Sequence, residues 1–97
     1  MNGAFRVVST PAFEREFRKI SRGNAALVDA LDALDELMAI LREDPHNRSG
    51  RYQIKKLAGL KAGEGQWRVR WREYRLRYDI VGGEVVLHSF RHRKEAY

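Results

Sequence analysis

Apolar residues recur at helical spacing through most of the first half of the chain. In residues 25–43 five large apolar residues recur at separations of four, three, four and three, which is the repeat of one helix face. A shorter stripe covers residues 11–21, where Thr10 and Pro11 are typical of a helix start. Both segments are predicted to be helices packed as a hairpin, because a coiled coil needs a longer heptad repeat. The stripes consist of Phe13, Phe17 and Ile20, and of Leu27, Leu31, Leu34, Met38 and Leu41, with Val28, Leu37 and Ile40 widening the second one.

The period changes to two in the second half. In residues 66–72 arginine alternates strictly with Trp or Val, and residues 74–80 repeat the alternation after a tight turn at Arg72-Glu73. Gly82-Gly83 is a hairpin signal, and residues 84–91 form the next predicted strand. Apolar residues of both parities in that strand indicate a central strand covered on both sides. Trp67, Val69 and Trp71 are therefore expected on one face, and Arg68, Arg70 and Arg72 on the other.

These elements predict an α+β fold, with one domain over residues 1–97. Residues 5–9 form the first strand, and residues 51–65 form a basic, glycine-punctuated loop with a possible short strand. The N-terminal strand and the helical hairpin are expected on one face of a small, mainly antiparallel, curved sheet. The other face of the sheet would be open and rich in arginine.

Composition narrows the class of protein. Hydrophobic residues are 43% and charged residues 33%, an ordinary globular mixture. No apolar run approaches the roughly 18 residues of a membrane span, and the N-terminus lacks the regions of a signal peptide, so a soluble, cytoplasmic protein is expected. The chain has no cysteine, which excludes disulfides, thiolate zinc sites and thiol nucleophiles. The chain has only three histidines, too few to favour a metal site of histidines alone. No metal and no cofactor are therefore expected.

The net charge of +6 is unevenly distributed. Residues 51–97 hold twelve Lys or Arg against five Asp or Glu, a net charge of +7, whereas residues 1–50 have seven against eight, a net charge of −1. Concentrated arginine and a pI near 10.1 favour a polyanionic partner, nucleic acid before membrane.

The predicted arginine-rich face carries the candidate chemistry. Like charges opposite each other destabilise a sheet, so these arginines need an external anion or internal carboxylates. Two interpretations remain: a ladder whose aliphatic stems cover the sheet while the guanidinium heads stay in water, or phosphate recognition by guanidinium forks, which we favour. The candidates are Arg68, Arg70, Arg75 and Arg77.

The last six residues add further candidates. His92 can move protons near neutral pH, although a lone histidine among cations is more often a surface side chain. His88, inside a predicted strand, is expected to be structural. Tyr97 could be a core residue, a stacking platform for a base or a proton donor.

Several of these segments, in this order, resemble the RelE/ParE superfamily of bacterial toxins from toxin–antitoxin systems. The ending from His92 to Tyr97 favours the RelE-like ribonuclease branch over the ParE-like gyrase inhibitors, which are similar in fold. The segments that carry the resemblance are Lys56-Leu57-Ala58-Gly59-Leu60, Gly65-Gln66-Trp67-Arg68-Val69-Arg70, Tyr74-Arg75-Leu76-Arg77-Tyr78, Val85-Val86-Leu87 and His92-Arg93-Lys94-Glu95-Ala96-Tyr97.

The resemblance implies a toxin of a type II toxin–antitoxin pair with a RelE-like fold and metal-independent endoribonuclease activity. Such an enzyme cuts messenger RNA, usually on the translating ribosome, by attack of a 2′-hydroxyl that leaves a 2′,3′-cyclic phosphate. It also implies a cognate antitoxin, acidic and partly disordered, that wraps the toxin, with operator DNA bound only through the antitoxin and no membrane partner.

The resemblance also assigns roles to residues. Arg75 matches the arginine that binds the scissile phosphate, Arg93 the arginine near the leaving oxygen, and Tyr97 the stacking or proton-relaying tyrosine. Arg68 and Arg70 stand where some relatives have lysines, one of them a proposed base, and arginine cannot deprotonate in proteins. Proton transfer then falls to His92 or Tyr97, or catalysis is mostly positioning and charge stabilisation. Lys55, Lys56, Lys61, Arg77 and Arg91 are expected to bind RNA, with Arg91 as a possible substitute for Arg93.

Two other functions stay open at this point. A ParE-like toxin would block gyrase without cutting RNA, and the tail would need no chemical role. A basic RNA-binding module without activity would use the arginine-rich face alone.

Overall fold

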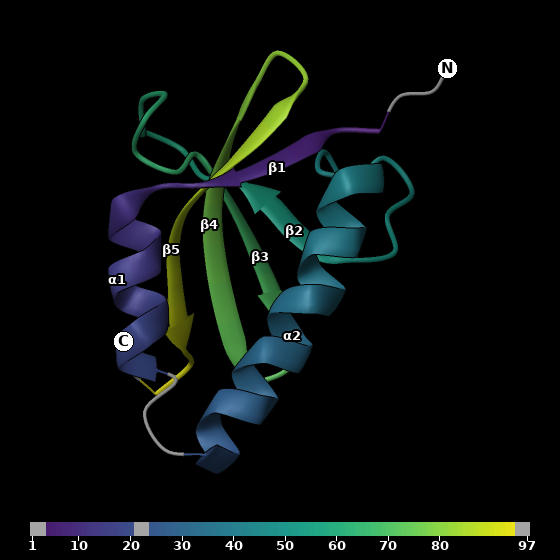
Figure 1. Cartoon of the computed structure of the whole chain (residues 1–97). Helices are drawn as coiled ribbons and strands as arrows, with labels where there is room; N and C mark the ends of the chain where they lie inside the picture. The colour runs from purple at the N-terminus through teal and green to yellow at the C-terminus, as the bar shows by residue number, and fades with distance from the viewer. Residues whose placement is uncertain (1–3, 21–23, 95–97) are drawn as a thin grey trace.

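The computed structural model describes residues 4–20 and 24–94, and only the backbone of residues 24–26. Within these residues it contains two helices and five strands (Figure 1). Along the chain they are β1 (Arg6–Ser9), α1 (Pro11–Ile20), α2 (Asn24–Glu43), β2 (Gln53–Lys56), β3 (Trp67–Trp71), β4 (Tyr74–Val81) and β5 (Glu84–His92).

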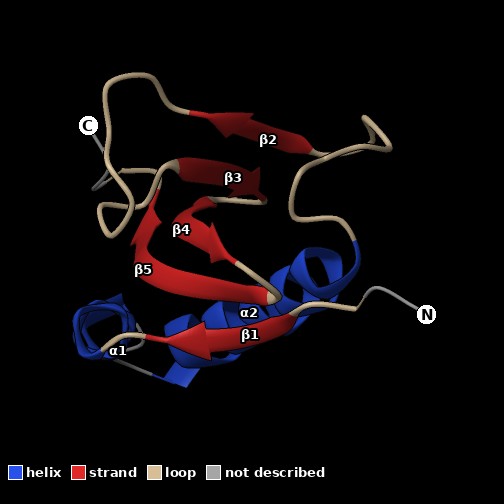
Figure 2. Ribbon diagram, turned by 90° about the horizontal axis from the view of Figure 1, so that it is seen from above, coloured by secondary structure: helices blue, strands red, loops and turns tan. Residues whose placement is uncertain are grey.

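The strands form one mixed sheet in the order β1-β5-β4-β3-β2. β1 runs parallel to β5 and the other neighbours are antiparallel, so the predicted α+β fold is confirmed, and β2 is the short strand foreseen as possible in residues 51–65. Figure 2 shows both helices near the β1–β5 end of the sheet, with β2 at the opposite end. The core includes Phe13, Ala33, Leu37 and Leu41 from the helices and Val69, Leu76, Tyr78, Val85, Leu87 and Phe90 from the strands.

The start of α1 is fixed by Thr10. The Thr10 hydroxyl oxygen accepts a hydrogen bond from the Phe13 backbone N–H at 3.1 Å, the contact of a helix N-cap, and the hydroxyl donates to the Leu87 carbonyl at 2.9 Å. One side chain therefore both begins the helix and ties it to β5. The predicted helix over 11–21 is confirmed to Ile20, and residue 21 lies outside the described residues.

The buried face of α2 differs from the predicted apolar stripe. Leu27 and Leu31, expected at the core, are 36% and 42% exposed. The Tyr74 hydroxyl donates to the Asp29 carboxylate at 2.6 Å, so the face next to Asp29 turns toward the sheet, and small alanines there allow close approach. The core positions of the helix are Ala30, Ala33, Leu37 and Leu41.

The mixed parity of β5 has a different cause from the one expected. β5 does lie inside the sheet, between β1 and β4. However, Tyr78 pairs with Leu87 whereas the preceding Arg77 pairs with Ser89, so His88 is an extra residue at a β-bulge. Odd-numbered side chains point to the helices before the bulge, and even-numbered side chains do so after it. Val85 and Leu87 before it and Phe90 after it are therefore all buried on the same face of the sheet.

Arg72 does not join the arginine-rich face. It occupies the β3–β4 turn with a left-handed backbone (φ 54°), and its guanidinium reaches the helix side of the sheet. There it pairs with Glu36 at 3.0 Å and with Asp29 at 3.5 Å, both on α2. Strict alternation ends at Trp71 because the turn changes the direction of the chain. The prediction for Arg72 was wrong.

A buried tyrosine hydroxyl offers a test of the packing. Tyr78 is fully buried, and its hydroxyl donates to the Pro45 carbonyl at 2.6 Å. Tyr78→Phe leaves that carbonyl without its partner, and we expect the free energy of unfolding to fall by about 1–3 kcal/mol in urea denaturation. Tyr52→Phe is the matched control, since Tyr52 is only half-buried and the described residues provide no hydrogen-bond partner for its hydroxyl. Equal stability of the two variants would contradict this account of the packing.

Candidate nucleic-acid interface

The sheet carries two rows of cations on the side away from the core. The pairing of β2, β3, β4 and β5 places Arg70 opposite Arg75, and Arg75 opposite Arg91. Directly opposed side chains have Cβ atoms about 4.5–5.5 Å apart, so these arginines leave the sheet next to one another. The two rows are Gln53, Arg70, Arg75 and Arg91, and Lys55, Arg68, Arg77 and Ser89. We call the cations of these rows the arginine face: Lys55, Arg68, Arg70, Arg75, Arg77 and Arg91.

Arg77 has a structural role within this face. Its guanidinium donates to the Gly65 carbonyl at 3.0 and 3.1 Å and to the Glu64 carbonyl at 2.7 Å. It therefore holds the end of the loop that enters β3. Arg77 was predicted to bind RNA, and that prediction is not tested by these contacts, although they occupy several of its donors.

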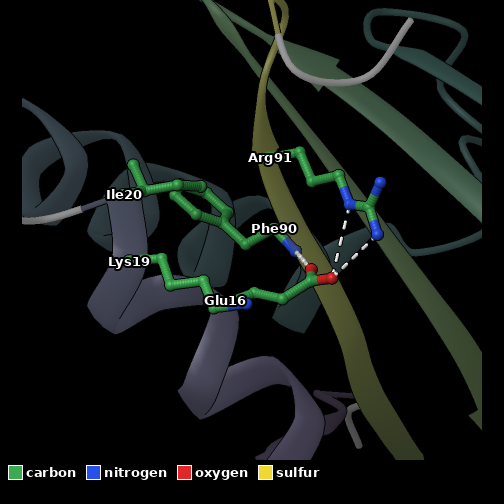
Figure 3. A pocket seen from close by; sticks show the side chains of 5 residues that line it. All are labelled: Glu16, Lys19, Ile20, Phe90 and Arg91. Carbon is green, nitrogen blue, oxygen red and sulfur yellow. Dashed lines mark hydrogen bonds and ion pairs between the residues drawn. The ribbon is translucent and has the colours of Figure 1, made fainter.

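Arg91 is tied to α1 by Glu16 (Figure 3). The Glu16 carboxylate accepts the Phe90 backbone N–H at 3.0 Å and pairs with the Arg91 guanidinium at 3.0 Å. β1 pairs with β5 only as far as Leu87, and beyond that point Glu16 of α1 accepts the hydrogen bond from the β5 backbone. The same side chains, with Lys19 and Ile20, line a small cavity of about 240 Å³. Arg91 consequently has part of its charge compensated at the margin of the arginine face.

The other cations of the face differ in their partners. Within residues 4–20 and 24–94, no carboxylate forms a salt bridge with Lys55, Arg68 or Arg70. Lys55 and Arg70 are exposed and Arg68 is half-buried. Their mutual repulsion is therefore not relieved by the carboxylates of the described residues, which leaves a surface suited to an external anion.

The C-terminal candidates are separated by the structure. His92 pairs with Tyr74 across the strands and its ring packs edge-on to the Tyr74 ring, with centroids 5.5 Å apart, on the helix side of the sheet. Arg93 forms a salt bridge with Glu73 at 3.1 Å beside the β3–β4 turn. Tyr97 lies outside the described residues. The structure thus places His92 on the opposite side of the sheet from Arg75.

The three candidate lysines also divide. Lys55 belongs to the arginine face, whereas Lys56 points to the helix side, with its ammonium 5.9 Å from the centre of the Trp67 ring. Lys61 is exposed in the loop between β2 and β3. Only Lys55 is therefore in line with the arginines of β3 and β4.

Sequence reasoning missed a buried carboxylate that supports the face. Asp79 is 1% exposed, and its oxygens accept the backbone N–H groups of Gly63, Gly65 and Gln66 at 2.8–3.1 Å. His88 Nε2 lies 2.8 Å from the same carboxylate, in line with the expectation that His88 is structural. An acidic residue inside a strand, close to a glycine-rich loop, is the signal that could have indicated this clamp.

The environment of Asp79 also sets its ionisation. Burial alone would raise the pKa of the carboxyl, but the hydrogen bonds from Gln66, Gly65 and Gly63 and the nearby His88 outweigh burial and hold the pKa below its ordinary value. Gly65 is required here: its φ is 79°, and a Cβ would lie 3.2 Å from the Arg77 Cβ. The ionised Asp79 therefore fixes the loop that leads directly into Trp67 and Arg68.

The described residues contain neither a membrane-spanning helix nor a cluster of metal ligands. Among residues 4–20 and 24–94, no helix is long and apolar enough to cross a membrane. In the same residues, no group of three or more histidine, aspartate or glutamate side chains is arranged to hold a metal ion. The arginine face is cationic, and guanidinium groups bind anions such as phosphate in a bidentate way.

Comparison with known proteins agrees with the fold. Residues 7–97 match the family model described as the ParE toxin of the type II toxin–antitoxin system parDE. No curated protein sequence matches the chain.

Two solved structures share the fold. A chain of the RelBE2 toxin–antitoxin complex from Mycobacterium tuberculosis is 22% identical, with 93% of this chain and 99% of that chain covered and a TM-score of 0.66. A chain of the RelB–RelE antitoxin–toxin complex from Methanococcus jannaschii is 17% identical, with 93% and 94% covered and a TM-score of 0.59.

The five-stranded sheet, the helical hairpin and the match over nearly the whole chain define a toxin of a type II toxin–antitoxin system. The chain belongs to the ParE toxin family.

Proposed function

We propose that this toxin is a metal-independent endoribonuclease that cuts messenger RNA on the translating ribosome in the cytoplasm and so inhibits translation. The observation that carries the proposal is the cross-strand arrangement of Arg68, Arg70 and Arg75, in which cations stand side by side on a fixed sheet. Planar guanidinium groups bind phosphate in a bidentate way, and a row of them matches a polyanionic strand.

The proposed reaction needs charge stabilisation more than any other help. The 2′-oxygen attacks the adjacent phosphorus and loses its proton, the bond to the 5′-oxygen breaks, and that oxygen takes up a proton. The products are a 2′,3′-cyclic phosphate and a free 5′-hydroxyl. Arg75 and Arg93 stabilise the charge that develops on phosphorus, and Tyr97 relays a proton or stacks on a base. His92 lies on the helix side of the sheet and has no part in this proposal. Arg68 and Arg70 bind the phosphates on either side.

A gyrase inhibitor is the second candidate function. The description of the matched family, ParE toxin, favours it, and so does the position of His92 on the helix side of the sheet. In that case the arginine face would contact a protein or DNA surface. Substitutions in the segment from His92 to Tyr97 would then have no effect on RNA cleavage.

The partner that we propose is a cognate antitoxin with an acidic, partly disordered segment that folds on binding. Both solved relatives come from toxin–antitoxin complexes. The acidic segment would neutralise the half of the chain with a net charge of +7, and apolar residues next to it would cover Leu31 and the groove formed by Phe13, Phe17 and Leu34. Operator DNA is reached only through this antitoxin.

The first test of the proposal is the salt dependence of RNA binding. The four proposed phosphate-binding arginines are Arg68, Arg70, Arg75 and Arg93. For four such contacts to a single strand, a plot of the logarithm of the affinity against the logarithm of the salt concentration should have a slope of about −3. Arg70→Ala should reduce the steepness by about 0.7, because one contact is lost. The measurement is fluorescence anisotropy with single-stranded RNA at several salt concentrations. Lys56→Ala, on the helix side, is the control and should keep the wild-type slope. A flat affinity for the wild-type protein would contradict the proposal.

A further inference from the structure

A cavity at the outer end of the sheet spans the edge between the arginine face, with Gln53 and Arg70, and the helix side, with Tyr52 and Trp71. This cavity of about 360 Å³ lies between the start of β2 and the β3–β4 turn, within the range of small-ligand sites. It shares Gln53 and Arg70 with a neighbouring hollow of about 320 Å³ that also includes Lys55 and Arg68. The two hollows adjoin at Gln53 and Arg70, on the strands that Figure 2 shows at the end of the sheet opposite β1. Trp71 and Arg72, which are hydrogen-bonded to Glu36, bring the outer cavity next to α2. The outer cavity is lined by Arg51, Tyr52, Gln53, Arg70, Trp71 and Arg72.

Tyr52 is the aromatic wall of this cavity, and its position is fixed. The Asn47 side chain donates to the Tyr52 carbonyl at 2.8 Å and accepts the Tyr52 backbone N–H at 3.1 Å. Trp71 lies edge-on to the Tyr52 ring, with centroids 6.4 Å apart, and its indole N–H donates to Glu36 of α2 at 2.8 Å. The ring is thus held by contacts that do not involve its own hydroxyl.

The cations around Tyr52 have different roles. Arg72 is engaged by Asp29 and Glu36, so it serves as a wall rather than a free phosphate ligand. Arg51 is exposed and lies over the Tyr52 ring, with its guanidinium carbon 5.4 Å from the ring centre. Stacking of a nucleobase on an aromatic ring is a stronger interaction than an exposed cation–π contact. A base therefore displaces Arg51 from the ring and frees its guanidinium for a phosphate.

We propose that this outer cavity is a seat for one base of a single-stranded RNA whose backbone runs along the arginine face. The base stacks on Tyr52, and Arg51 and Arg70 bind the phosphates next to it. Because every base has a flat π-face, the seat accepts any base. The proposal rests on the proposed RNA-binding function, which it extends by one nucleotide outside the reacting centre.

The test uses short single-stranded RNA with 2′-O-methyl groups, which cannot undergo 2′-hydroxyl attack. Its affinity is measured by anisotropy for wild type, Tyr52→Ala, Tyr52→Phe and Tyr52→Trp. Tyr52→Ala should weaken binding by about 5- to 150-fold, which is the stacking energy converted to affinity, with an unchanged salt slope because no phosphate contact is lost. The two aromatic variants should bind like wild type. If Phe and Trp weaken binding as much as Ala, the seat does not act by stacking and the proposal is overturned.

A second measurement needs no variant. RNAs with 2-aminopurine at successive positions are bound to the wild-type protein, and the fluorescence should be quenched by stacking when the label is at one particular position. An abasic nucleotide at that position should remove the difference in affinity between wild type and Tyr52→Ala. Uniform behaviour along the strand would overturn the seat. Different results refute the base seat and the RNA-binding function. Steep salt dependence with no effect of Tyr52→Ala refutes the seat alone, whereas wild-type protein without salt-dependent RNA binding refutes the proposed function and the seat with it.

Discussion

Arg75→Ala is expected to slow cleavage of ribosome-bound mRNA by about a hundred- to a thousandfold. Arg75 stands on β4, the middle strand of the sheet, between Arg70 and Arg91 in one cross-strand row. Loss of one preorganised cationic contact to a transition-state charge typically has this effect. The side chain is half-buried and the core lies on the other face, so the fold should persist. Single-turnover cleavage separates this loss from weaker binding.

Matched variants sharpen the interpretation of that result. Arg93→Ala should also abolish toxicity while the protein still folds and binds its antitoxin, and Tyr97→Phe reports whether the hydroxyl or the ring matters. Lys56→Ala, whose side chain packs on Trp67 on the helix side, should keep wild-type rates. Near-wild-type rates for both arginine variants would mean that the roles implied by the family resemblance do not apply to this chain.

The second large effect is on stability. Asp79→Ala is expected to lower the free energy of unfolding by about 3–5 kcal/mol, a large part of the roughly 5–15 kcal/mol available to a domain. The variant leaves the N–H groups of Gly63, Gly65 and Gln66 without their acceptor and His88 without its partner. Urea denaturation measures the loss. A change below 1 kcal/mol would show that the clamp contributes little.

The same carboxylate predicts a pH dependence. Because the folded-state pKa of Asp79 lies below its ordinary value near 3.8, its ionised form stabilises the protein above that value, and this stabilisation is lost as pH falls through the folded-state pKa. The stability difference between wild type and Asp79→Asn should therefore be largest near neutral pH and shrink below about pH 4. A difference that grows on acidification would contradict the assigned direction.

Regular patterns carried most of the fold prediction. Strict alternation from Trp67 to Trp71 was sufficient to predict both faces of β3, because side chains of a strand alternate without exception until a turn or bulge. The same rule failed at Arg72, where the turn begins, and around His88, where a bulge adds one residue. The turn leaves no signal in the apolar pattern, whereas the bulge gives β5 its apolar residues of both parities, a pattern that a strand covered on both sides would also give.

The site was predictable where it depends on neighbouring strands and not where it depends on distant ones. Arg68, Arg70 and Arg75 lie together because a two-residue turn fixes the register of β3 and β4. The salt bridge of Arg91 with Glu16 joins residues 75 positions apart, and no local rule indicates it. For Asp79, burial is decided by a loop that folds back over the sheet, which the period of the strand does not reveal.

The most direct test combines three assays on the same purified toxin. Primer extension on mRNA from a translating system detects cleavage, end analysis detects a 2′,3′-cyclic phosphate, and a supercoiling assay detects gyrase inhibition. We predict discrete cleavage within translated reading frames, cyclic phosphate ends, loss of both in Arg75→Ala, and unaffected gyrase. Intact mRNA together with inhibited supercoiling would contradict the ribonuclease function and establish the gyrase-inhibitor alternative.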